Sequence, residues 1–314
     1  MSAAAELRRA VTERHGVADV HLAVTHGVAK HEFYRDTAGT GWSAPLPGVR
    51  VRKGVPRSVK RDLATVAAAS THLVAASELT AAWLLGARQR PTRPATFVIA
   101  YGTDVPNLRG TRGRRARWLL PSDVEVRDGV PTLVGPAVAV SASRLRAEQL
   151  RALLIDLGFN GTCTPEEVLD RLDTVGPVPG RGTLRRECER LVGRTVESIF
   201  QEDVLEALTE LGCRPERSTF RIETSDGVGL TSDVALKDWK VSLEPEGDAF
   251  HSSREQRRLD RRRMAAYAGT EWAPVPIDWR DWRDDRGHVL DAIDAAIESQ
   301  RRRGIGQDVP PPRR

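Results

Sequence analysis

The sequence predicts a multidomain α/β protein, and three observations support this fold class. The chain has 314 residues, which is more than one small core usually holds. Segments with helical periodicity alternate with short β-branched runs along its length. A Pro- and Gly-rich segment at 176–182 without apolar periodicity separates two such halves, so we expect a linker there.

The composition is that of an ordinary folded protein, with 40% hydrophobic and 29% charged residues. The longest apolar stretches, such as residues 133–140, are far shorter than the roughly 20 residues that cross a bilayer, so no membrane partner is expected. The N-terminal residues lack the apolar core of a secretory signal, which predicts a cytoplasmic location. The three cysteines, Cys163, Cys188 and Cys213, form no CxxC pair and are expected to be buried thiols.

The first 56 residues have the spacing of a winged helix-turn-helix. Three short helices are expected between residues 3 and 35, broken at Gly16 and Gly27. Gly27 suits the tight turn of a helix-turn-helix, with residues 28–34 as the second helix and residues 48–54 as a wing strand. A plain helical bundle cap is the alternative interpretation.

Residues 57–175 predict a small α/β module. A helix pair is expected at 59–86, a strand at 96–101 and helices at 143–157 and 165–172. Asp128-Gly129 between two alternating runs is a strong signal for a β-hairpin. The segment 108–117 holds five arginines, among them Arg112 and Arg114, and no acid. This predicts either a solvated loop or a loop that grips a nucleic-acid backbone.

The pattern of residues 183–303 predicts helices and strands in the order α-β-β-β-α-β-α. A disordered tail is expected at residues 304–314. Acidic residues recur along this domain: Glu197 on the first helix, Asp233 on the second strand, and Glu244 and Glu246 on the third. Side chains two apart share a face of a strand, and Asp233 can reach them from the neighbouring strand. Such a cluster favours a hard divalent ion, Mg²⁺ or Mn²⁺, and an ion of this kind suits phosphodiester hydrolysis.

A histidine and a basic helix follow the acids. His251 could donate or accept a proton at the leaving oxygen. Arg254, Arg258 and Arg261 lie at spacings of four and three, so a helix would present them on one face toward phosphates. A solvated surface helix beside ordinary surface acids is the alternative.

The ordered motifs of this half resemble the endonuclease-like domains related to very-short-patch-repair (Vsr) endonucleases, of the PD-(D/E)XK superfamily. The residues that carry the resemblance, between Thr195 and Trp282, are Glu197, Asp233, Glu244-Pro-Glu246-Gly247, His251, Asp260-Arg-Arg-Arg263 and Ile277-Asp278-Trp279. It implies a restriction-endonuclease-like α/β/α domain with Asp233 and Glu244 at the metal. It also implies Glu246 at a variable acidic position, Glu197 as a helper and His251 as acid or base.

The first half is similar to the winged-helix and α/β module of AbiEi-type antitoxins. The carrying residues are Thr25-His-Gly-Val28, Gly48-Val-Arg-Val51 and, most specifically, the run Leu120 to Pro131. The resemblance implies sequence-specific DNA binding. The candidate contacts are Lys30, His31, Arg35, Arg50, Arg52 and Lys53.

Two functions remain open at the level of the sequence. The first is a DNA-binding protein with a Mg²⁺-dependent endonuclease domain, for which defence against foreign DNA is a fitting role. The second is a non-enzymatic, antitoxin-like transcriptional regulator whose nuclease fold is degenerate. Pro245 within the strand and the lack of a lysine at the position of Glu246 motivate the second. RNA is an alternative target, and a cognate toxin or a second copy of the chain is an alternative partner.

Overall fold

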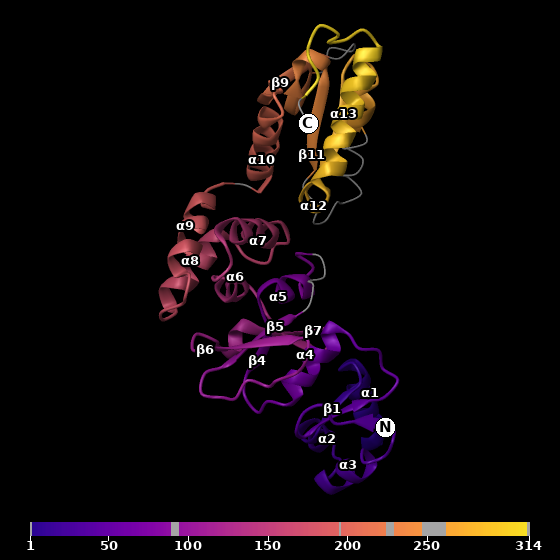
Figure 1. Cartoon of the computed structure of the whole chain (residues 1–314), viewed down its shortest axis with the longest axis vertical. Helices are drawn as coiled ribbons and strands as arrows, with labels where there is room; N and C mark the ends of the chain where they lie inside the picture. The colour runs from indigo at the N-terminus through magenta and orange to yellow at the C-terminus, as the bar shows by residue number, and fades with distance from the viewer. Residues whose placement is uncertain (1, 89–93, 195, 224–228, 247–261, 313–314) are drawn as a thin grey trace. The chain divides into compact units, whose positions relative to one another are not determined.

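The computed structural model describes residues 2–88, 94–194, 196–223, 229–246 and 262–312. These residues form two compact units, one ending at Val192 and one beginning at Gly193 (Figure 1). The described part contains helices and three separate sheets, so the chain is a multidomain α/β protein. No described helix is long and apolar enough to cross a membrane.

The first unit begins with the predicted helix-turn-helix and wing. The elements are α1 (Ala3–Glu13), β1 (Val17–Asp19), α2 (Val20–Thr25), α3 (Lys30–Asp36), β2 (Trp42–Ser43) and β3 (Val49–Arg52). The strands form a small antiparallel sheet in the order β1-β3-β2. Gly27 stands in the turn between α2 and α3 with a φ of 76°, a conformation that a side chain disfavours.

A five-stranded sheet follows, in the order β6-β5-β4-β8-β7. The elements are α4 (Val59–Ala68), β4 (Val74–Ala76), α5 (Glu78–Leu84), β5 (Ala95–Ala100), β6 (Thr111–Ala116), β7 (Val124–Arg127) and β8 (Val130–Leu133). The expected hairpin is present, with positive φ at both Asp128 and Gly129. Strand β4 lies between the two helices that the sequence predicts as a pair.

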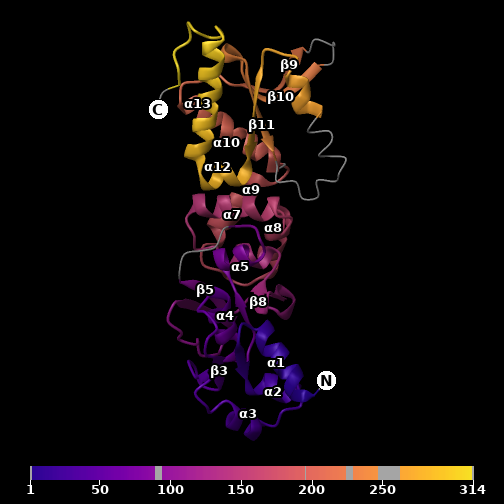
Figure 2. The same ribbon diagram turned by 90° about the vertical axis from the view of Figure 1, so that its right-hand side faces the viewer.

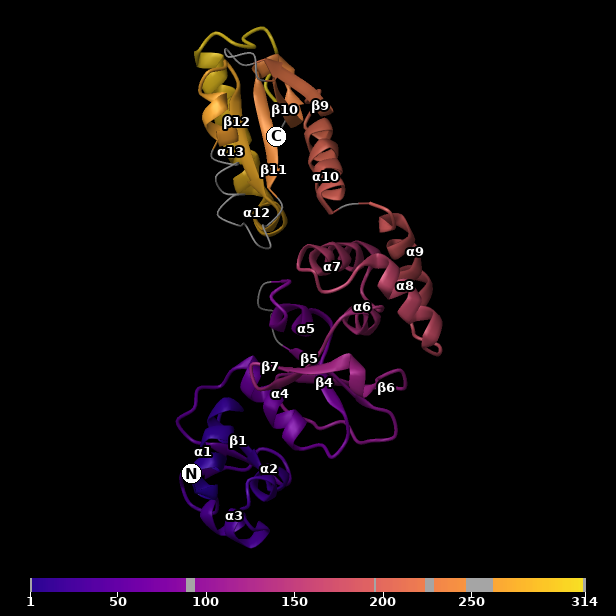
Figure 3. The same ribbon diagram turned by 180° about the vertical axis from the view of Figure 1, so that it is seen from behind.

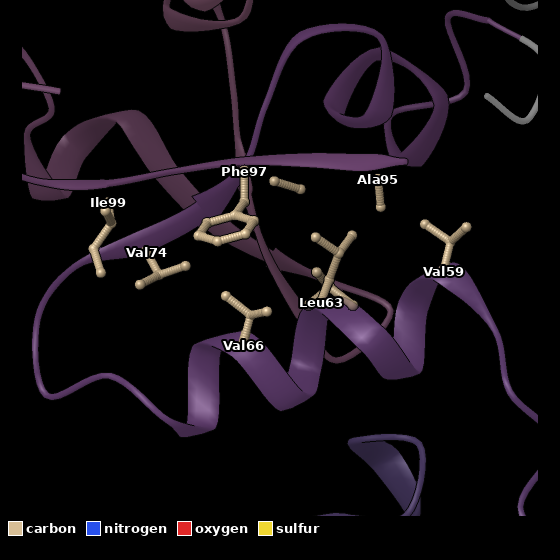
Figure 4. Close-up of a cluster of buried hydrophobic side chains, with 9 residues drawn as sticks. Val59, Leu63, Val66, Val74, Ala95, Phe97 and Ile99 are labelled. Carbon is tan, nitrogen blue, oxygen red and sulfur yellow. The ribbon is translucent and has the colours of Figure 1, made fainter. Parts of the chain in front are cut away.

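The arginine-rich segment predicted as a loop is largely the edge strand β6, parallel to β5. Gly113 permits this pairing, because a Cβ there would lie only 2.3 Å from the Phe97 ring. Side chains of α4 pack on one face of the same sheet, where Leu63 and Val66 approach Phe97 and Ile99 (Figure 4). This apolar layer anchors the strands, although the basic edge strand itself contributes little apolar surface.

The winged helix and the α/β module share one body. Val17, Val49 and Val51 of the small sheet pack in one cluster with Ala64 of α4. The predicted division at residues 56 and 57 therefore does not separate two compact units.

The first unit ends in four helices, α6 (Pro136–Ser141), α7 (Ala147–Phe159), α8 (Pro165–Thr174) and α9 (Arg181–Leu191). The expected linker at 176–182 is a packed turn instead. A Cβ on Gly180 would lie 1.9 Å from the Ser143 carbonyl oxygen, and Ser143 Oγ donates to the Pro179 carbonyl at 2.7 Å. The division between the units consequently falls after α9 rather than before it.

The second unit is built on a four-stranded sheet in the order β12-β11-β10-β9. Its elements are α10 (Val196–Glu210), β9 (Glu216–Glu223), β10 (Gly229–Leu236), β11 (Val241–Glu246), the helical residues 262–267, β12 (Ala273–Asp278), α12 (Trp279–Asp284) and α13 (Arg286–Arg302). Strands β9, β10 and β11 are antiparallel neighbours, and β12 is parallel to β11, as Figure 3 shows from behind. Helices α10 and α13 lie on one side of the sheet, and residues 262–267 lie on the other (Figure 2).

The described C-terminal residues differ from the disordered tail that the sequence predicts. Gly306 lies against Trp239, where a Cβ would come within 2.6 Å of the indole ring. Arg301 Nη1 donates to the Val309 carbonyl at 2.9 Å. The three cysteines are free thiols and all are buried, as expected from the sequence.

Candidate functional site

The structure brings Asp233 and Glu244 together on neighbouring strands of the second unit. Val234 of β10 pairs with Leu243 of β11, so one further step along each antiparallel strand places the two acids opposite one another. Arg263 lies between them. Its Nη2 atom is 3.7 Å from Asp233 Oδ2 and forms a close ion pair with Glu244 Oε2. The two carboxylates therefore face one common cation.

A network of hydroxyl groups fixes Glu244 from the other side. Its Oε1 atom accepts hydrogen bonds from Ser242 Oγ at 2.7 Å and from the Tyr267 hydroxyl at 2.5 Å. Ser242 Oγ is also 2.9 Å from the Tyr267 hydroxyl and 2.5 Å from Ser232 Oγ. With Oε1 held in this way, Oε2 is the oxygen that faces Arg263.

Burial dominates the electrostatics of Glu244. The carboxyl is only 6% exposed, and this desolvation raises its pKa although the hydroxyls of Tyr267 and Ser242 and the Arg263 guanidinium oppose the shift. The nearby Asp233 adds to the increase. Burial also raises the pKa of Tyr267, and the hydrogen bond to Glu244 raises it further, so this hydroxyl remains a donor at neutral pH.

The donor set suits a hard divalent cation. Three oxygens converge on one Nη2 atom: Asp233 Oδ2, Glu244 Oε2 and the Thr231 carbonyl oxygen, which accepts from it at 2.7 Å. Carboxylate and carbonyl oxygens are the ligands that Mg²⁺ and Mn²⁺ prefer. The guanidinium thus acts as a stand-in cation, and a metal ion could use the same oxygens once Arg263 had left them. No group of three metal-ligating His, Cys, Asp or Glu side chains occurs within the described residues.

The remaining predicted members of this site are only partly described. Glu197 lies near the start of α10, and Glu246 ends β11. The side chains of both residues lie outside the described part of the structure. The other predicted members lie outside the described residues: His251, Arg254, Arg258 and Arg261.

No role is predicted from the sequence for Arg263, Tyr267 or Ser242. A signal for the first two was available, because residues four apart share one face of a helix. Arg263 also ends the Asp-Arg-Arg-Arg run. Ser242 is two residues before Glu244 and so shares its strand face, but a lone serine gives no signal of its own.

The candidate DNA contacts of the first unit lie on α3 and the wing. Lys30, His31 and Arg35 are exposed on α3, and Arg52 and Lys53 are exposed at the end of β3. Arg50 of β3 lies over the Tyr34 ring of α3, with 5.3 Å between the guanidinium carbon and the ring centroid. This contact joins the wing strand to the second helix of the helix-turn-helix.

The acidic residue Glu32 also lies on α3. Its Oε2 atom accepts a hydrogen bond from the backbone N–H of Ala29 at 3.1 Å, so it caps its own helix. Arg35 is paired with the neighbouring Asp36, and both side chains are exposed. A pair of this kind is weak in water and can be exchanged for a phosphate.

Arg112 and Arg114 on β6 have different environments. Arg114 Nη1 forms an ion pair at 2.8 Å with Glu78, whose backbone has a φ of 52° and whose N–H donates to Ser141 Oγ. Burial raises the pKa of Glu78, and the nearby arginines oppose this shift. Arg114 therefore pairs with a buried carboxyl, whereas Arg112, whose charge also opposes the rise in the pKa of Glu78, is exposed to solvent.

No protein-family model matches this chain, and no curated protein matches it. Among solved structures, the chain is similar to the Rv2827c protein from Mycobacterium tuberculosis, with a TM-score of 0.38 and 16% sequence identity. The match covers 63% of this chain and 80% of that chain. A likeness of this degree assigns neither a family nor a function.

Proposed function

We propose that this chain is a DNA-binding protein whose second unit hydrolyses phosphodiester bonds with a divalent metal ion. The observation that carries the proposal is the convergence of Asp233, Glu244 and the Thr231 carbonyl on one cation position. Burying a carboxylate is unfavourable, so a carboxylate that is nevertheless buried and held by two hydroxyls supports a functional role for Glu244.

The arrangement of the second unit supports the same function. Its order, one helix, three antiparallel strands, a further helix and a fourth strand parallel to the third, agrees with the order that the sequence pattern predicts, and the resemblance to Vsr-related nucleases implies an α/β/α domain. Asp233 and Glu244 would hold Mg²⁺ or Mn²⁺, and the bound ion would supply Lewis-acid activation of the phosphodiester and of water. Tyr267 and Ser242 orient Glu244 for this task.

The first unit would supply the affinity for DNA. Lys30, Arg35, Arg50 and Arg52 belong to the helix and wing that a winged helix presents to the duplex. The Arg50–Tyr34 contact keeps the wing strand and the helix in one arrangement. We expect these cations to contribute a salt-dependent affinity for phosphates.

The test is cleavage of supercoiled plasmid by the full chain, with Mg²⁺, Mn²⁺ or EDTA, and with short RNA in parallel. Asp233→Asn and Glu244→Gln should each abolish cleavage while DNA binding in EDTA is retained. Asp238→Asn, which removes an exposed acid from the turn between β10 and β11, is the matched control and should retain cleavage. Cleavage that persists in both site variants would show that another site is responsible.

A non-enzymatic regulator is the second candidate, and the ion pair of Arg263 with Glu244 favours it. An arginine that permanently neutralises the carboxylates would leave no place for a metal. This candidate predicts DNA binding of unchanged strength with and without divalent ions, and no calorimetric signal for Mn²⁺. A Mn²⁺ signal that is lost in Asp233→Asn would exclude it.

A further inference from the structure

We propose that Arg263 is an exchangeable counter-ion that couples nucleic-acid binding to metal binding. In the free protein it holds Asp233 and Glu244, and when a strand binds it passes to a phosphate and leaves the oxygens to the metal. The inference rests on the proposed function and assigns a positioning role that the sequence motifs do not.

The buried carboxylate of Glu244 needs a positive charge beside it. Its side chain is 7% exposed, and Oε1 is already held by Ser242 and Tyr267. A buried, ionised carboxylate without a cation is strongly destabilising, so Glu244 requires a counter-ion at Oε2 to remain ionised in the free protein. Arg263 fills this requirement without any metal.

The Arg263 side chain can leave the two carboxylates. Its side chain is 42% exposed, and its distance of 3.7 Å to Asp233 is longer than a hydrogen bond. Asp233 is itself 41% exposed, so solvent reaches this side of the pair. A guanidinium binds phosphate through two parallel N–H donors, which makes a phosphodiester a suitable new partner.

Arg263 and a metal ion exclude one another from this position. Arg263 Nη2 contacts the same three oxygens that would bind a metal ion, so the two cations cannot occupy the position together. A phosphate that draws Arg263 away therefore raises the affinity for metal. By thermodynamic linkage, metal must then raise the affinity for the strand by the same factor.

The test is calorimetric titration of the full chain with Ca²⁺, with and without a short DNA duplex. Ca²⁺ prefers oxygen ligands and serves here as the probe of the cation position. Arg263→Gln should bind Ca²⁺ more tightly than wild type in the absence of DNA, by about tenfold, and DNA should increase its affinity less than that of wild type. Arg262→Gln is the matched control, because Arg262 is an exposed neighbour that contacts neither carboxylate in the described part of the chain.

Arg263→Lys keeps the positive charge and should give a Ca²⁺ affinity close to wild type without DNA, which separates loss of charge from loss of packing. Circular dichroism checks that each variant is folded. Equal Ca²⁺ affinities of wild type and Arg263→Gln, with binding still lost in Asp233→Asn, would overturn the counter-ion role and leave the proposed function intact. Absence of Ca²⁺ binding in every variant, with DNA present, would overturn both.

Discussion

Glu244 illustrates how a single carboxyl can determine the pH response of the second unit. Burial raises its pKa in the folded protein above the value in the unfolded chain. The native state thus holds this proton to higher pH than the unfolded state does. The contribution of Glu244 to stability is complete below the unfolded pKa and is lost as the pH rises through the folded pKa.

Glu244→Gln removes this dependence, because an amide does not titrate. We expect the free energy of unfolding of the variant, minus that of wild type, to increase from about pH 4 to about pH 8, across the range above the ordinary pKa of a glutamate. Urea unfolding in EDTA, followed by circular dichroism, measures the difference. A difference that is constant over this range would contradict the raised pKa.

Tyr267 provides a second prediction at the same scale. Tyr267→Phe removes the hydroxyl that donates to Glu244 Oε1 and leaves a buried acceptor with one donor fewer. We expect a loss of about 1–3 kcal/mol in the free energy of unfolding at neutral pH. The loss should shrink at acid pH, where the protonated carboxyl can donate to Ser242. Urea midpoints at both pH values test this, and an equal loss at both would indicate a packing effect alone.

Among the elements, the hairpin of β7 and β8 connects the winged helix to the α/β module. Gly129 in its turn has a φ of 72°, and a Cβ there would lie 2.1 Å from the Glu13 carbonyl oxygen at the end of α1. Lys60 Nζ and His15 Nε2 also contact Asp128 in the same turn, at 2.6 Å each. The turn is therefore a packing surface as well as a connection.

Gly129→Ala should destabilise the first unit by about 3 kcal/mol, through the positive φ and the clash together. Gly48→Ala is the control, because Gly48 has a φ of 74° with nothing within 4 Å of a Cβ. This control should cost only about 1 kcal/mol. Urea unfolding of the two variants isolates the contact between hairpin and α1, and equal losses would show that the contact adds nothing.

For the whole molecule, the position of the division between units determines which fragments can fold. Helix α9 belongs to the first unit: Leu184 and Cys188 are fully buried, and the almost fully buried Glu187 pairs with Arg151 of α7 at 2.9 Å. A fragment that stops before α9 exposes the apolar surface that these residues cover.

We predict that residues 1–192 fold as a fragment with one cooperative unfolding transition, and that residues 1–175 do not. The shorter fragment leaves Arg151 without its partner and uncovers the apolar residues of α7 and α8. Thermal unfolding and gel filtration of the two fragments compare them. A stable, monomeric fragment 1–175 would show that α9 is dispensable.

The sequence predicts the elements whose signals are local. Turn chemistry at Asp128 and Gly129 locates the hairpin, and apolar periodicity locates α8. Prediction from the sequence fails where one local pattern is compatible with two structures. The arginines of β6 suggest a loop, and the Pro-Gly run before α9 suggests a linker. In both places a glycine, Gly113 or Gly180, instead permits a tight tertiary contact.

The candidate site shows the same limit. Strand alternation is a local property, so the sequence predicts that Glu244 and Glu246 share a face and that Asp233 can reach them from the neighbouring strand. The cation that joins them comes from residues 262–267, which reach the sheet only through tertiary packing. No local pattern contains that contact.

The buried thiols can report the opening of each unit separately. Cys163 and Cys188 lie in the first unit and Cys213 in the second, and burial raises their pKa to about 12, about 12 and about 11. A neutral, enclosed thiol reacts with an alkylating reagent only when its surroundings open. Mass spectrometry of the peptides that carry each cysteine would therefore give an opening equilibrium for each unit, within one intact chain and without any added label.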